Sequence, residues 1–237
     1  GSTDTNTEHE LEIRFGTKYG KITKINYDNV IKKLRSMGFQ LTSKHSENRL
    51  RIMSKNMNKV RCDIYGAENI STYCKTNNLS KIPHERYSFV EKYAPDGIQP
   101  YDNSEFKFRV SYQIERLVND VDKINGYLSS WKDMQKRFRY ISRISFTHSS
   151  MPNVKVDMTI TKASRIQNGQ YVPEYTIEAA NVFNNPENYE IEFEILPNTS
   201  TAEEINATIK KMVKFISCGL QETNYPIPQT MQSYVLT

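Results

Sequence analysis

Hydrophobic and polar residues alternate along several stretches of this chain, most regularly in Tyr189-Glu190-Ile191-Glu192-Phe193-Glu194-Ile195-Leu196. Successive side chains of a β-strand point to opposite faces, so the three glutamates would share one face and the large apolar residues the other. A helix would scatter the acids around its circumference, so the period predicts a strand. The acids then stand about 7 Å apart, and such like charges repel unless water or a cation lies among them.

The same alternation occurs near the start of the chain. In Glu10-Leu11-Glu12-Ile13-Arg14-Phe15-Gly16, the charged residues fall on one face and the apolar residues on the other. We therefore expect a second acid-bearing strand at the opposite end of the sequence. Before it, we expect residues 1–9 to be a protease-cleavage remnant, Gly1-Ser2, followed by a flexible polar segment.

Three further alternating stretches carry mainly bases on their polar faces. They span residues 106–115, 137–146 and 154–162. Their polar faces include Lys107, Arg109 and Glu115 in the first stretch, Arg137, Arg139 and Arg143 in the second, and Lys155 and Asp157 in the third. We expect three strands that each pack an apolar face and present a charged one.

The rest of the pattern is shorter and mixed. Further strands are predicted over 48–54, 59–65 (with Arg61), 85–92 and 173–181 (with Glu178). Helices are predicted over 27–37, 67–78, 117–131 and 202–218, the last starting at a capping box and ending at Gly219. About eight alternating strands favour an antiparallel barrel or sandwich, a mainly β (α+β) fold. We expect a single domain over residues 10–219 and an extended tail over 220–237.

Composition limits the classes of function. The 237 residues suit one large or two small domains, and the net charge of +5 permits a polyanionic partner without requiring one. The three cysteines and four histidines fit no zinc, disulfide or Cys–His nucleophile pattern, which indicates reduced thiols in a cytoplasmic setting. No apolar run approaches the roughly 20 residues of a membrane helix, and no signal peptide occurs. We therefore expect a protein that is not secreted.

Acidic and basic residues fall on different predicted strands, and this distribution indicates where the charged faces point. Acids dominate 10–14 and 190–194, whereas bases dominate 107–109 and 137–143. For any one strand, a sheet with its charged face in water explains the pattern well enough. Segregation of acidic and basic residues onto different strands instead favours a closed barrel with a functional interior. The apolar faces of the strands would then point outward, where the helices would cover them.

Such an interior has a definite chemistry. Clustered carboxylates without histidine or cysteine suit a hard divalent cation, Mg²⁺ or Mn²⁺. Facing guanidinium and ammonium groups suit phosphate oxygens. A divalent cation and a basic wall around a polyphosphate stabilise the charge of a transferring phosphoryl group. The pattern therefore indicates hydrolysis of a phosphoanhydride.

The two acidic motifs together resemble a known family. Glu10-Leu11-Glu12-Ile13-Arg14-Phe15-Gly16 near the start, with Glu190-x-Glu192-x-Glu194 near the end, is similar to the triphosphate tunnel metalloenzymes. Within them, the chain resembles the metal-dependent RNA triphosphatases of fungi, protozoa and large DNA viruses. The basic segments Arg143-Ile-Ser-Phe and Lys155-x-Asp157-x-Thr159 resemble their basic strands. The resemblance spans residue 8 to about residue 218.

The resemblance implies a fold and an activity. It implies a closed eight-stranded antiparallel barrel that removes the γ-phosphate from triphosphate-ended nascent RNA, the first step of mRNA capping. Free NTPs would also be hydrolysed, with Mg²⁺ or Mn²⁺ as cofactor. Covalently linked guanylyltransferase and methyltransferase domains would be partners in a full-length viral capping enzyme. The implied location is cytoplasmic, in a viral factory or virion.

The resemblance also assigns roles to individual residues. Glu10, Glu12, Glu192 and Glu194 would hold the metal, and Glu190 would bridge to the basic wall. Asp157 would orient a basic neighbour, and Glu115 is a candidate for positioning the attacking water. Phosphate binding would fall to Arg14, Arg61, Lys107, Arg109, Arg139, Arg143 and Lys155.

Two other functions fit the same residues. One is a tunnel enzyme that hydrolyses inorganic polyphosphate or NTPs. The other is a non-catalytic RNA-binding barrel that uses its bases on phosphates. Such a module would gain nothing from acids opposite the bases and should bind RNA without metal.

Overall fold

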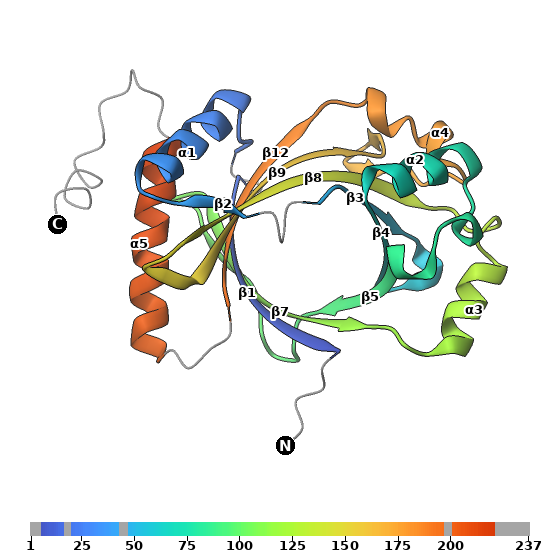
Figure 1. The fold of residues 1–237 in the computed structure, drawn as a ribbon, viewed down its shortest axis with the longest axis horizontal. Coiled ribbons are helices and arrows are strands. Elements are labelled where there is room, and N and C mark those ends of the chain that lie inside the picture. The colour runs from blue at the N-terminus through green and yellow to red at the C-terminus, as the bar shows by residue number, and fades with distance from the viewer. Residues whose placement is uncertain (1–5, 17–19, 43–46, 197–200, 221–237) are drawn as a thin grey trace.

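Eight antiparallel strands close into a barrel in the computed structural model, which describes residues 6–16, 20–42, 47–196 and 201–220 (Figure 1). Around the barrel the order is β1-β12-β9-β8-β3-β4-β5-β7, and β7 pairs again with β1. The bounds are β1 (Thr7–Phe15), β3 (Arg49–Met53), β4 (Val60–Tyr65), β5 (Tyr87–Tyr93), β7 (Phe108–Leu117), β8 (Arg137–His148), β9 (Met151–Ala163) and β12 (Asn188–Ile195). The β1–β7 pairing excludes a sandwich and confirms the closed eight-stranded barrel.

Helices cover the outside of the barrel, and two hydrophobic cores lie beneath them. Helices α1 (Lys24–Ser36) and α5 (Ala202–Leu220) pack on the apolar faces of β1, β8, β9 and β12. On the opposite side, α2 (Ala67–Thr76), α3 (Val121–Ser129) and α4 (Ile177–Ala180) cover β3, β4 and β5 (Figure 1). Because the apolar faces point outward into these cores, the polar faces of the strands point into the barrel.

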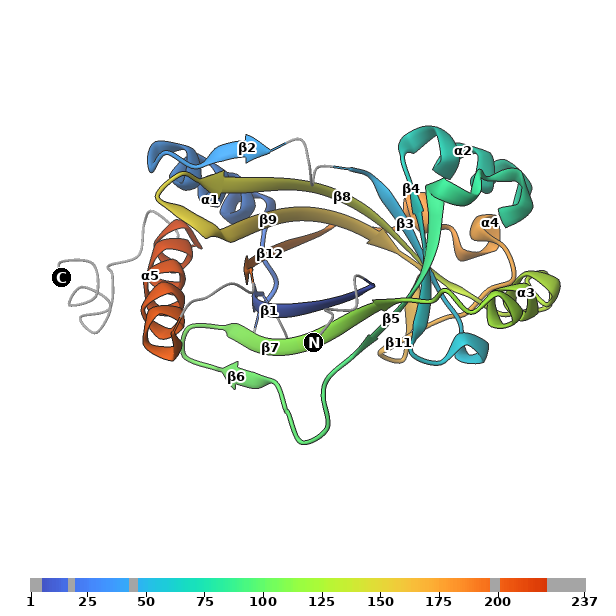
Figure 2. The same cartoon turned by 60° about the horizontal axis from the view of Figure 1, so that its bottom comes forward.

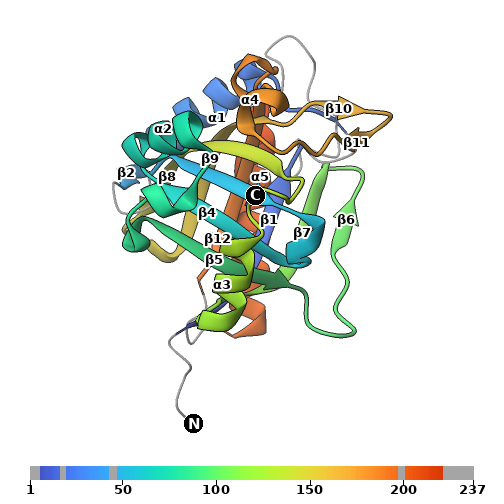
Figure 3. The same cartoon turned by 90° about the vertical axis from the view of Figure 1, so that its right-hand side faces the viewer.

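Short elements complete the fold at the barrel's ends. They are β2 (Gln40–Thr42) on β8, β6 (Tyr101–Asn103) on β7, the hairpin β10 (Ile166–Gln167) and β11 (Gln170–Tyr171), and the 3₁₀ turns η2 (Lys55–Met57), η3 (Leu79–Lys81), η4 (His84–Arg86) and η5 (Val182–Asn184). Figure 2 shows β2 and β6 at the margins of the barrel, and Figure 3 shows the β10–β11 hairpin projecting from it. In the part of the chain that the structure describes, no helix is both long and apolar enough to cross a membrane.

The strand predicted over 173–181 is wrong. Residues Ile177–Ala180 of this segment instead form helix α4, whose first turn is capped by Thr176 because its hydroxyl accepts from the Ala179 amide. Asn181 ends the helix in the left-handed conformation. Glu178 therefore lies on a surface helix, where it accepts a hydrogen bond from Asn77, and it does not belong to the barrel interior.

The ends of two other elements also differ from the prediction. Strand β1 begins at Thr7, so part of the segment expected to be flexible pairs with β7. Helix α5 continues through Gly219 to Leu220, so this glycine does not stop it. A Cβ at Gly219 would lie 2.9 Å from Val30 Cγ2 of helix α1, so close packing of the two helices explains the glycine. The tail expected over 220–237 lies outside the described residues beyond Leu220.

This contact gives a matched pair of predictions. Gly219→Ala should lower the free energy of unfolding by about 1–3 kcal/mol, because the added methyl overlaps Val30 on a well-packed helix. Gly126→Ala, in the interior of α3 with no atom within 4 Å of the new Cβ, should instead be neutral or stabilising by up to about 1 kcal/mol. Urea unfolding of the two variants measures the difference. An equal effect of both would show that α1 and α5 are loosely packed.

Candidate active site

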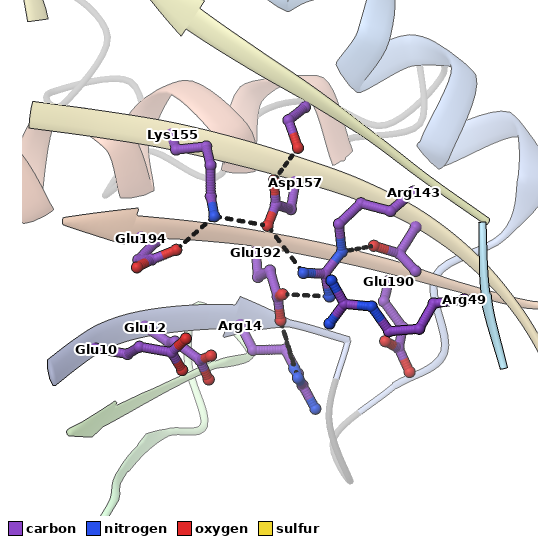
Figure 4. A network of polar contacts seen from close by, with 12 residues as sticks. Glu10, Glu12, Arg14, Arg49, Arg143, Lys155, Asp157, Glu190, Glu192 and Glu194 are labelled. Carbon is purple, nitrogen blue, oxygen red and sulfur yellow. Dashed lines mark hydrogen bonds and ion pairs between the residues drawn. The ribbon is translucent and has the colours of Figure 1, made fainter. Parts of the chain in front are cut away.

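The acid-bearing strands β1 and β12 lie side by side and turn their charged faces into the barrel. In their register Glu12 lies opposite Glu194, and Arg14 opposite Glu192. On the far edge of β12, Glu192 pairs with Asp157 of β9 and Glu194 with Lys155. Figure 4 shows these side chains converging inside the barrel. The structure therefore brings the two ends of the sequence together into one charged wall.

A single ammonium group lies among three of the carboxylates. Lys92 Nζ on β5 is 2.7 Å from Glu10 Oε2, 2.9 Å from Glu12 Oε1 and 2.9 Å from Glu115 Oε1. Its side chain is only 19% exposed. Three carboxylates around one cation leave an excess of negative charge, even though Arg61 Nη2 also contacts Glu115 at 2.6 Å.

Two of these carboxyl groups, Glu10 and Glu115, differ strongly in pKa. Burial raises the pKa of Glu10 to about 8, and Lys92 offsets this only in part. Burial acts in the same direction on Glu115, but Arg61 and Lys92 together outweigh it and lower the pKa to about 2. Glu115 is therefore a fixed carboxylate, whereas Glu10 is the more readily protonated of the two acids.

Glu192 lies at the centre of the network and is buried. Arg14 Nη2 contacts its Oε2 at 2.9 Å, and Arg143 Nη2 contacts its Oε1 at 3.0 Å (Figure 4). Burial alone would raise the pKa of Glu192, but the two guanidinium groups outweigh it and lower the pKa to about 2. Glu192 on β12 thus fixes the positions of Arg14 on β1 and Arg143 on β8, which lie on either side of it in the strand order.

The neighbouring acids hold the remaining bases. Lys155 Nζ contacts Glu194 Oε2 at 2.7 Å and Asp157 Oδ2 at 3.5 Å. Asp157 also contacts Arg143 at 3.2 Å and accepts a hydrogen bond from Ser145. Glu190 forms an ion pair with Arg139. These contacts place Glu190 beside Arg139, and Asp157 beside Arg143 and Lys155, while the roles expected of the two acids stay predictions.

A second network lies across the barrel, and of its members only Arg61 was expected from the sequence. Asp63 of β4 accepts two hydrogen bonds of 2.9 Å from Arg51 of β3, and Arg61 and Arg49 each contact it at 3.5 Å. Burial would raise the pKa of Asp63, but the arginines outweigh it and hold the pKa at about 2. Arg61 Nε is fully buried and lies 3.5 Å from Asp63 Oδ2, an ion pair that is too long and poorly aligned to count as a hydrogen bond.

Solved structures with this arrangement of strands are known. The chain matches the RNA triphosphatase domain of a trifunctional mimivirus mRNA capping enzyme with a TM-score of 0.60 and 17% identity, over 88% of this chain and 89% of that chain. The monoclinic form of the mimivirus capping enzyme triphosphatase matches with a TM-score of 0.59 and 17% identity, over 90% of each chain. The chain has the triphosphate tunnel fold. No family model and no curated protein matches its sequence.

The tunnel contains nearly all the site residues expected from the sequence. Glu10, Glu12, Glu190, Glu192, Glu194, Glu115, Asp157, Arg14, Arg61, Arg109, Arg139, Arg143 and Lys155 lie on strand faces that point inward. Arg109 is held by Asp102 of β6 at 2.7 Å. Lys107 is the exception, because it precedes β7, is exposed and has a φ of 55°. The turn into β7 thus removes Lys107 from the tunnel wall.

The donor set of this tunnel fits a divalent cation. Glu10, Glu12 and Glu194 offer only carboxylate oxygens, the ligands that Mg²⁺ and Mn²⁺ prefer. Two of them already place an oxygen within 2.9 Å of one cation, Lys92 Nζ. No three such groups form a complete ligand cluster among residues 6–16, 20–42, 47–196 and 201–220, because each carboxylate is turned toward a base. Glu192 is wholly engaged by arginines and fits a metal less well than the other three.

The buried acids give a prediction about acid stability. The pKa of Asp63 is about 2 in the folded protein and about 3.9 in an unfolded chain, so its ionised form stabilises the fold above pH 4 and this stabilisation is lost as the pH falls toward 2. The contribution is about 2–3 kcal/mol. Urea unfolding between pH 7 and pH 3 should show a plateau above about pH 5 and a decline below it. Asp63→Asn should make that decline shallower, although Glu115 and Glu192 retain their own contributions, and an unchanged slope would contradict the assignment.

Proposed function

We propose that this protein is a metal-dependent RNA 5′-triphosphatase, which removes the γ-phosphate of triphosphate-ended RNA and also hydrolyses free NTPs. The observation that carries the proposal is the tunnel interior, in which Glu10 and Glu12 contact Lys92 and Glu194 contacts Lys155. Acids alone would suit a cation, and bases alone would suit an anion. Their alternation inside one tunnel suits a phosphate chain together with its metal ion.

The bases of the tunnel would bind the phosphate chain. Arg143, Arg139 and Arg14 are each held in place by a carboxylate, so their guanidinium groups are preorganised before substrate arrives. Arg61 is likewise held, by Asp63 and Glu115, and would add positive charge to the same wall. Negative charge that develops on the transferring phosphoryl group would be stabilised by these fixed donors.

Glu10, Glu12 and Glu194 would hold the metal, which supplies charge neutralisation on the phosphate oxygens when bound. Glu115 would orient the attacking water as a hydrogen-bond acceptor. Its low pKa makes it a weak base, so its role is to position the water rather than to take up the proton fully.

In the cell, the reaction would be the first step of mRNA capping. Its product, a diphosphate-ended RNA, is the substrate for guanylyl transfer. A guanylyltransferase and a methyltransferase, as linked domains, are the partners that this proposal implies. The mimivirus domain with the same fold comes from an enzyme described as a trifunctional mRNA capping enzyme, which supports this assignment.

Release of labelled γ-phosphate from triphosphate-ended RNA, with and without Mg²⁺ or Mn²⁺, tests the proposal. We expect release only with metal, and slower release from ATP or inorganic tripolyphosphate. Release from tripolyphosphate alone would favour a polyphosphate hydrolase. RNA binding without hydrolysis in any metal would favour the non-catalytic binding barrel and overturn the proposal.

A further inference from the structure

A cavity of about 410 Å³ lies at one end of the barrel, between the η2 turn, the start of β8 and the β10–β11 hairpin. Figure 3 shows this hairpin standing out beside the barrel. The residues that carry chemistry in the cavity are Lys55, Asn56, Gln135, Arg137, Gln170 and Tyr171. None of them is needed for the phosphate chemistry proposed above.

The cavity adjoins one end of the tunnel. Arg137 pairs with Met53, the last residue of β3, so it stands at the end of both strands. It shares the inward face of β8 with Arg139, whose partner Glu190 belongs to the tunnel wall. Residues two apart on a strand are separated by about 7 Å. A chain that leaves the phosphate-binding wall past Arg139 would therefore meet Arg137 next.

The walls of the cavity are fixed by contacts of the backbone. Ser54 Oγ donates to the Gln135 carbonyl and ties the η2 turn to the segment before β8. Lys136 and Glu174 exchange two backbone hydrogen bonds of 2.8 Å, which tie the returning strand of the hairpin to the same segment. The buried Lys136 ammonium donates to the Trp131 and Met134 carbonyls. The cavity is thus formed without a ligand.

The charges of the cavity differ from those of the tunnel. The tunnel bases Arg14, Arg139 and Arg143 are each paired with a carboxylate. Among the residues that the structure describes, Lys55 and Arg137 have no such partner. Tyr171 is 42% exposed, although large aromatic side chains are usually more buried. Two free cations, an exposed aromatic ring and three amides are the groups that bind single-stranded RNA.

We propose that this cavity binds the first nucleosides of a triphosphate-ended RNA, whose phosphate chain lies in the tunnel. The inference rests on the proposed function. It adds that contacts in this cavity make the protein select triphosphate-ended RNA over a bare phosphate chain. Tyr171 stacks on a base, Lys55 and Arg137 contact the backbone phosphates, and the amides of Asn56, Gln135 and Gln170 contact base edges.

The test compares Tyr171→Ala and Lys55→Ala on two substrates and in one binding assay. For triphosphate-ended RNA of five nucleotides, each substitution should raise KM about 10-fold, whereas hydrolysis of inorganic tripolyphosphate should change less than twofold. A 3′-labelled RNA of five nucleotides with a 5′-hydroxyl cannot be hydrolysed, and fluorescence anisotropy should show about 10-fold weaker binding by both variants. Lys55→Ala should also reduce the salt dependence of binding by about 0.7 in the log–log slope.

Two control variants test whether the effects come from the aromatic ring of Tyr171 and from the position of the Lys55 charge. Tyr171→Phe keeps the ring and should bind the 5′-hydroxyl RNA within twofold of the wild type. Lys32→Ala on helix α1 removes the same charge from an exposed site elsewhere and should leave both assays unchanged. If Tyr171→Ala and Lys55→Ala affect RNA and tripolyphosphate equally, or affect neither, the cavity does not bind RNA. If the wild type cleaves neither substrate, the proposed function itself is wrong, and this inference falls with it.

Discussion

Replacing Glu12 by glutamine is expected to reduce metal-dependent release of γ-phosphate by about 100-fold to 1000-fold. Glu12 lies opposite Glu194 in the β1–β12 pair and contributes one of the oxygens around Lys92 Nζ. Glutamine keeps the size of the side chain and a carbonyl that accepts from Lys92, so the fold should be preserved. Only the charge that would hold the divalent cation is lost. Initial rates at saturating Mn²⁺ measure the activity, and circular dichroism of the same sample measures whether the fold is preserved.

Glu203→Gln, on the exposed first turn of α5, is the matched control and should keep full activity. Full activity of Glu12→Gln would remove Glu12 from the metal site. Glu192 is a less suitable position for this experiment, because it pairs with both Arg14 and Arg143. Its removal would leave two buried guanidinium groups without a counter-charge, and loss of activity could then reflect misplaced arginines.

Asp63→Ala should lower the free energy of unfolding by about 3–5 kcal/mol, the largest effect on stability that we expect of a single substitution. The Asp63 side chain is 1% exposed and is surrounded by Arg51, Arg61 and Arg49. Without it, Arg51 and Arg49 would lose the acid that they contact inside the barrel, and Arg61 would keep only Glu115. Urea denaturation at pH 7 gives the change directly, from the shift of the midpoint at constant slope.

Asp96→Ala, at an exposed loop position, should change stability by less than about 0.5 kcal/mol. A second variant separates the loss of charge from the loss of packing. The double substitution Arg51→Met with Asp63→Leu fills the same space without the pair and should recover part of the lost stability. A single Asp63→Ala variant as stable as Asp96→Ala would show that solvent screens the arginines.

Long alternating strands made much of this site predictable. Glu190, Glu192 and Glu194 on one strand, and Glu10 and Glu12 on another, occupy the inward faces that a period of two assigns to them. The register also places Ile141 inward between Arg139 and Arg143, opposite Thr161. Strand period depends only on backbone geometry, and for this reason it can be read from the sequence.

The contacts that could not be predicted are those that form only when the barrel closes. Lys92, Arg51 and Asp63 lie on strands of five to seven residues, each with few charges, and the sequence does not show which distant strand they face. Local backbone chemistry caused the other errors. Lys107 has a positive φ at the turn into β7, and Thr176 caps a helix where alternation predicted a strand. Neither turn chemistry nor capping is visible in a two-residue period.

The pairing of β1 with β12 has a consequence for how the chain folds. Strand β3 pairs with β4, and β8 with β9, through short connections, whereas Leu11 pairs with Ile195 across nearly the whole described chain. Contacts of such long sequence separation form slowly, because the intervening chain must be ordered first. The carboxylates of the proposed metal site lie on both sides of this seam. During synthesis, the site would therefore be assembled last, after β12 has left the ribosome, so a chain truncated before β12 would have most of its strands but no place to bind the cation.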